Sequence, residues 1–119
     1  MSNPLEMVIG ASEVQRDAAL AAKHAEAAEK AEQKADRTTA IQEYRRSVTA
    51  DPTEAKNLFR LAFLLDISGE EDEAITMYQR AIERPPAPIN ALMNLAVLFE
   101  DRGEWAAAER CLRQILETN

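Results

Sequence analysis

The sequence predicts an all-α protein built from antiparallel helix-turn-helix repeats that stack into a right-handed superhelix. Three features lead to this prediction. Apolar residues make up 46% of the 119 residues but aromatic residues only 5%, and the many alanines favour closely packed helices over a sheet. The outline of the sequence recurs at an offset of 34 residues, a period typical of stacked helical hairpins. Gly69 and Gly103 stand at the same place in successive units, where a left-handed residue commonly ends a helix.

The 34-residue offset matches many positions besides the glycines. From the second unit to the third, the apolar positions Leu58, Leu61, Ala62 and Leu65 recur as Leu92, Leu95, Ala96 and Phe99, and Ala74, Tyr78 and Ala81 recur as Ala108, Leu112 and Ile115. Back to the first unit, the matching residues are Ala40, Tyr44, Ser47 and Pro52. Because independent positions agree at one offset, we divide the chain into an extension over 1–20 and repeats over 21–54, 55–88 and 89–119.

The first predicted element is one long, alanine-rich helix over residues 12–35. No glycine or proline occurs from Ala11 to Asp51, and Ser12 with Gln15 makes a capping box. Alanine buries little area, so this helix should pack closely but weakly. We favour an extended first helix that lies on the array, because a sustained heptad of large apolar residues is missing. A dimerising arm is the alternative.

The second unit, 55–88, contains two predicted helices. Its first helix places Leu58, Leu61, Ala62 and Leu65 on one apolar face. After Gly69, the acidic run 70–73 suits the N-terminal end of the next helix. The prolines at 85, 86 and 88 end that helix and mark a repeat boundary. A proline-rich ligand is a less favoured interpretation of the same stretch.

The third unit, 89–119, would leave an apolar face open on its second helix. Leu112, Ile115 and Leu116 would face a further helix, and repeat arrays generally need a polar cap. We therefore expect the chain to be part of a longer protein, cut just before the closing proline of the repeat. Packing of this face on a second copy of the chain is the alternative.

This pattern resembles the tetratricopeptide repeat, whose 34-residue unit favours large apolar, small, aromatic and proline residues at fixed positions. The second unit has Leu58, Leu61, Ala62, Leu65, Ala74, Tyr78, Ala81 and Pro86 at these positions, and the third has Leu92, Leu95, Ala96, Phe99, Ala108, Leu112 and Ile115. The first keeps Ala40, Tyr44 and Pro52 but has His24 and alanines in its first helix and lacks a turn glycine. The resemblance therefore covers 55–119 clearly and the first unit more loosely.

The resemblance implies a concave groove, lined by the first helix of each repeat, that holds an extended or helical peptide. Carried over by position, the groove residues are Lys56, Phe59, Arg60, Phe63, Asn90, Met93, Asn94 and Val97. Further positions are Asp66, Ile67, Glu100, Asp101 and, in the first repeat, Ala22, Ala25, Glu26, Glu29, Glu32 and Gln33.

The chemistry of these residues predicts how a partner would be held. The aromatic and aliphatic members would form an apolar floor, and the asparagines would bond a partner's backbone. Lys56 and Arg60 would offer a cationic spot for an acidic side chain or a C-terminal carboxylate. For Phe59 and Phe63, packing against the neighbouring helix is an equally good alternative. Some members of the family bind the acidic C-terminal tails of heat-shock chaperones through lysines and asparagines at fixed groove positions. This sequence lacks that pattern, so we do not expect it to bind such tails.

Composition argues against several other functions. The net charge of −7, from 14 basic and 21 acidic side chains, lacks the basic footprint of nucleic-acid binding and disfavours an anionic membrane surface. No stretch approaches the roughly 20 apolar residues of a membrane span. The N-terminus lacks the basic region of a signal peptide, and Cys111 is the single cysteine. We therefore expect a cytoplasmic, reducing location.

No constellation of catalytic or metal-binding residues is found in the sequence. His24 is the single histidine and stands at a helix-packing position, and Cys111 falls in the middle of a helix without a neighbouring histidine. The acidic run 70–73 lacks the spacing of a calcium loop. The sequence thus predicts no enzyme, metal or cofactor, but an adaptor that binds an unidentified protein. The alternatives are a homodimer through Leu112, Ile115 and Leu116 or the N-terminal helix, and a scaffold for a further domain beyond residue 119.

Overall fold

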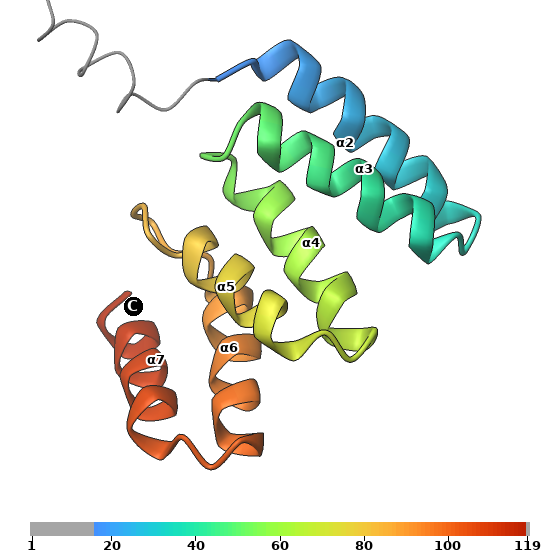
Figure 1. Ribbon diagram of the computed structural model, residues 1–119. Coiled ribbons are helices and arrows are strands. Elements are labelled where there is room, and N and C mark those ends of the chain that lie inside the picture. The colour runs from blue at the N-terminus through green and yellow to red at the C-terminus, as the bar shows by residue number, and fades with distance from the viewer. Residues whose placement is uncertain (1–15, 119) are drawn as a thin grey trace, which may run out of the picture.

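The computed structural model describes residues 16–118, and within that range it contains only helices (Figure 1). They are α2 (Ala18–Gln33), α3 (Arg37–Ala50), α4 (Ala55–Ile67), α5 (Glu71–Ala81), α6 (Ile89–Asp101) and α7 (Trp105–Thr118). Consecutive helices pair as three hairpins, and α3 packs on α4 as α5 packs on α6. The hairpins follow one another along the array in Figure 1, which confirms the predicted all-α superhelix.

The three hairpins share one turn geometry. Gly69 and Gly103 adopt φ values of 83° and 73°, and Ala35, 34 residues before Gly69, adopts 58°. In each turn, the residue after this position donates a backbone hydrogen bond back into the preceding helix: Asp36 to Ala31, Glu70 to Leu65 and Glu104 to Phe99. The first repeat therefore makes the same turn as the others, with alanine in the left-handed conformation that glycine adopts more readily.

Helix α2 begins later than the sequence predicted. The Asp17 carboxylate accepts a hydrogen bond from the Leu20 N–H at 3.0 Å and caps a helix that starts at Ala18. The Asp17 N–H donates to the Ala50 carbonyl, 2.8 Å away, and so ties this point to the end of α3. A continuous helix over 12–35 is therefore wrong at Arg16 and Asp17, and α2 ends at Gln33. Ser12 and Gln15 lie outside the described residues.

The core changes in character along the array. Helix α2 buries only alanines, Ala21, Ala28 and Ala31, whereas α4 and α6 bury the leucines that the repeat pattern assigned to the core: Leu58, Leu61, Leu65, Leu92 and Leu95. Between the first two repeats, the buried Ser47 hydroxyl donates to the Ala21 carbonyl at 2.7 Å and accepts from Asn57 Nδ2 at 3.1 Å. The contact between the first two repeats is therefore partly polar.

Candidate partner-binding groove

The first helices of the three hairpins, α2, α4 and α6, have side chains that meet on one face. Lys56 Nζ lies 3.6 Å from Glu29 Oε1, which joins α4 to α2. At the other edge of α4, Asp66 lies close enough to Asp101 of α6 for the second carboxylate to raise the pKa of the first. Two pairs of the residues expected to line the groove, Lys56 with Glu29 and Asp66 with Asp101, therefore lie near each other across helices.

The apolar part of this groove lies on α4 and α6. Met93 and Val97 are 47% and 51% exposed, and Ile67, on α4, is exposed to a similar degree. Phe63 is half-buried and lines a hollow of about 230 Å³ with Glu32, Ala35, Arg37, Leu64 and Ile67. These apolar side chains form a surface from which water can be displaced on contact.

Phe59 belongs more to the core than to the open groove. Its ring centroid lies 6.4 Å from that of Phe63 and 5.9 Å from that of Tyr78 on α5. Both phenylalanines pack against the buried cluster, so the alternative of helix packing holds for them in part. Phe63 nevertheless borders the hollow, whereas Phe59 joins α4 to α5.

The two cations of the groove already have partners within the chain. The Arg60 guanidinium pairs with the Glu32 carboxylate and lies 5.1 Å from the centroid of the Phe63 ring. The Tyr44 hydroxyl donates to the same carboxylate at 2.7 Å, and burial together with this carboxylate raises the pKa of Tyr44. Lys56 lies beside Glu29, so acidic residues of α2 partner both side chains of the predicted cationic spot.

The two asparagines differ in their surroundings. Asn94 Nδ2 donates to the Tyr78 hydroxyl oxygen at 3.1 Å, which gives a buried polar group its partner. Burial raises the pKa of Tyr78 to about 12, although the Asn94 hydrogen bond acts in the opposite direction. Asn90, at the beginning of α6, is exposed and offers both a donor and an acceptor.

Sequence reasoning gave no role to the acidic end of the groove. Asp66, Glu100 and Asp101 take part in none of the ion pairs found among residues 16–118. Burial, and then the charges of Glu71 and Asp101, raise the pKa of the Asp66 carboxyl. The sequence did place these residues in the groove, but only the structure shows that their charges stay uncompensated while the cations are paired.

A second exposed apolar surface lies on α7. Trp105, Leu112 and Leu116 are exposed, 67%, 40% and 72% respectively, and the spacing of seven and four residues puts them on one side of the helix. Ile115 instead packs partly against the core. The equivalent residue to Leu112 in the second repeat is Tyr78, which is buried and bonded to α6.

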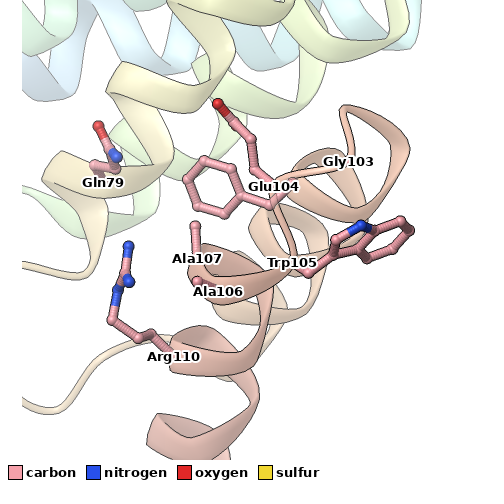
Figure 2. A pocket seen from close by; sticks show the side chains of 8 residues that line it. Gln79, Gly103, Glu104, Trp105, Ala106, Ala107 and Arg110 are labelled. Carbon is pink, nitrogen blue, oxygen red and sulfur yellow. The ribbon is translucent and has the colours of Figure 1, made fainter.

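A hollow of about 630 Å³ lies at the turn from α6 to α7, beside α5 (Figure 2). Its lining combines Phe99, Gln79, Glu104 and Arg110 with the small residues that begin α7. Figure 2 shows Gln79 and Arg110 on the same side of the turn, while the Trp105 ring points away from them. The hollow is open and carries no cluster of reactive groups.

His24 and Cys111 have structural surroundings. His24 Nδ1 lies 2.7 Å from Glu43 Oε2, between α2 and α3. Burial raises the pKa of the Cys111 thiol, which lowers its reactivity. Among residues 16–118, no group of three or more His, Cys, Asp or Glu side chains is placed to hold a metal ion. No helix in that range is long and apolar enough to cross a membrane.

The hairpins, their shared turn and their stacking define an α-solenoid, a class whose members are generally built for binding. Two profiles of the tetratricopeptide repeat match residues 55–88 and 91–119, together more than half of the sequence. The chain belongs to the tetratricopeptide repeat family. That family is generally a non-catalytic scaffold for interactions between proteins.

Solved structures show the same fold. A crystal structure of MamA superimposes with a TM-score of 0.77 at 22% identity over 86% of this chain, and a second MamA structure with 0.74 at the same identity and coverage. A chain of the CopN–Scc3 complex gives 0.72 at 19% identity over 80%. The matches cover 60%, 56% and 56% of those longer chains. No curated protein sequence matches significantly.

Proposed function

We propose that this chain is a non-catalytic interaction module, an adaptor that binds a peptide or helix of another protein on the face formed by α2, α4 and α6. The observation that supports it most is the row of apolar side chains, Phe63, Met93 and Val97, left half-buried or exposed on helices that bury the leucines Leu58, Leu61, Leu65, Leu92 and Leu95. Such surfaces commonly mark sites of protein binding.

The groove residues divide by role in this proposal. Met93, Val97 and Phe63 contact the partner's apolar side chains, and Asn90 bonds its backbone. The other four, Lys56, Phe59, Arg60 and Asn94, hold the shape of the groove through their contacts with Glu29, Tyr78 and Glu32. The proposal includes a reducing, cytoplasmic location, in which the thiol of Cys111 stays free.

The exposed side of α7 supports a second candidate function, self-association. Leu112 and Leu116 are exposed and would pack on a second copy of the chain. Ile115, which packs partly against the core, would lie at the base of this contact. An interface of this kind buries the same patch on both copies, as a two-fold axis requires.

A crossed pair of variants separates the two functions. Met93→Ser/Val97→Ser alters the groove, and Leu112→Ser/Leu116→Ser alters α7. All four side chains are exposed, so circular dichroism should show unchanged helicity in both variants. Arg60 is left intact, because a substitution there would disturb its contact with Glu32 as well as the groove.

The measurement is a pull-down from native cell extract with the two variants and the wild type, combined with molecular mass in solution. A protein retained by the wild type and the α7 variant, but not by the groove variant, would support the groove function. If the groove variant retained every partner of the wild type, the groove assignment would be wrong. A concentration-dependent mass that only the α7 variant loses would instead support self-association.

A further inference from the structure

Among the charged residues that the sequence assigned to the groove, those without an ion pair within residues 16–118 are acidic: Asp66, Glu100 and Asp101. Arg37, at the start of α3, borders the hollow beside Phe63 and is also outside these pairs.

On the α2 side, Lys56 lies beside Glu29, and Arg60 pairs with Glu32, which also accepts from the Tyr44 hydroxyl. An acidic partner would therefore have to compete with carboxylates that the chain supplies itself. That competition costs free energy, because a displaced and partly buried Glu32 would lose both a charged and a neutral hydrogen bond.

At the other end of the groove, acidic side chains lie close enough for their charges to interact. Asp66 is half-buried at the end of α4, and burial together with the charges of Glu71 and Asp101 raises the pKa of its carboxyl. Asp101 is the last residue of α6. None of the three takes part in an ion pair among the residues that the structure describes. A cationic side chain placed here would relieve repulsion between carboxylates and restore solvation lost on burial.

The acidic and apolar groups run along the same stripes of the two helices. On α6, Met93, Val97 and Asp101 follow one another at intervals of four residues, which places them on one side of the helix. On α4, Phe63 is followed three and four residues later by Asp66 and Ile67. A segment that crosses both helices therefore meets an apolar surface first and negative charge at its edge.

Resting on the proposed groove function, we infer that the partner is a basic, amphipathic peptide segment. Its large apolar side chains cover Met93, Val97 and Phe63, and its lysine or arginine side chains pair with Asp66 and Asp101. The long aliphatic stems of those basic residues suit this arrangement, since they pack on apolar surface while the charged group stays at the edge.

The test begins with selection of a display library of random short peptides on the full 119-residue chain. We expect the selected sequences to combine large apolar residues with an excess of Lys and Arg. One selected peptide is then synthesised with a fluorophore, and its binding is measured by anisotropy. Binding should weaken as salt is added, because the pairs with the carboxylates are partly exposed.

Two nearly isosteric double variants locate the charge. Asp66→Asn/Asp101→Asn removes the two groove carboxylates and should weaken binding about fivefold or more at low salt. Glu109→Gln/Glu117→Gln removes two exposed carboxylates from α7 and should change the affinity less than about twofold. Helicity measured by circular dichroism checks that each variant is folded.

Failure of the inference and failure of the groove function give different results. Acidic or uncharged peptides that lose affinity for Met93→Ser/Val97→Ser would leave the groove function in place and overturn the basic partner. Basic peptides that bind Asp66→Asn/Asp101→Asn with the same affinity as the wild type would also overturn the basic partner and leave the groove function in place. Selected peptides that bind Met93→Ser/Val97→Ser as tightly as the wild type, or a library without any enriched peptide, would overturn both.

Discussion

Replacing Ala35 by glycine should stabilise the protein, because this alanine occupies a backbone conformation that favours glycine. Its φ is 58°, and the residues at the same place in the next two repeats are Gly69 and Gly103, with φ values of 83° and 73°. Ala35 is exposed, so the substitution removes little buried surface. The effect of Ala35→Gly is therefore mainly one of backbone conformation.

The magnitude follows from two opposing contributions. A non-glycine residue in the left-handed region costs about 1–2 kcal/mol, whereas glycine costs about 0.5–1 kcal/mol through its freedom in the unfolded chain. We expect Ala35→Gly to raise the free energy of unfolding by about 0.5–1 kcal/mol, the difference of the two. For a domain of this size, that corresponds to an increase in Tm of about 2–4 °C.

Gly69→Ala is the matched control with the opposite sign. A Cβ added at Gly69 would meet no atom within 4 Å, so its cost is also conformational. Urea unfolding followed by circular dichroism should show a higher midpoint for Ala35→Gly and a lower one for Gly69→Ala, with unchanged slopes. An unchanged or lower stability of Ala35→Gly would refute the assignment of a shared turn to the first repeat.

Further substitutions test the core, the ion pair between α2 and α4, and the acidic end of the groove. Leu61→Ala should lower the free energy of unfolding by about 2–5 kcal/mol, because Leu61 is 1% exposed; a change near zero in urea unfolding would contradict the repeat register. Arg60→Glu should destabilise by about 1–2 kcal/mol, since it removes an ion pair and places a second carboxylate beside Glu32, and Arg60→Gln should cost less in the same assay. Asp66→Asn should raise Tm at neutral pH, because a carboxyl whose pKa is raised on folding destabilises the folded protein when it is ionised. The gain should fall as pH drops through the folded-state pKa and vanish below the ordinary value of 3.8, where both states are protonated; a gain that persists there would show that the charge of Asp66 is not its cause.

The sequence predicts the repeat architecture well because the repeat depends on short-range periodicity. Leu58, Leu61 and Leu65 share a helix face by spacing alone, and the structure buries all three. The end of α4 before Gly69 follows from backbone preference at a single residue. Such features need no knowledge of distant parts of the chain.

The electrostatics of the groove depend on distant parts of the chain, which the sequence does not reveal. Arg60 and Glu32 are 28 residues apart, and their pairing depends on how closely α2 approaches α4. Nothing in the local pattern distinguishes this paired arginine from one that faces solvent. The left-handed Ala35 was missed for a related reason: alanine favours the helix locally, and the packing of α2 on α3 overrides that preference.

The uneven core described above has a consequence for the order of folding. The second and third hairpins bring leucines together within short stretches of chain, so they supply the nucleus, and folding then propagates to the neighbouring repeat. The first hairpin has only alanines on the buried side of α2, so it brings less apolar burial of its own than the other two. Although it is synthesised before them, we expect it to become ordered after the other two hairpins, when α4 is in place to pack against α3.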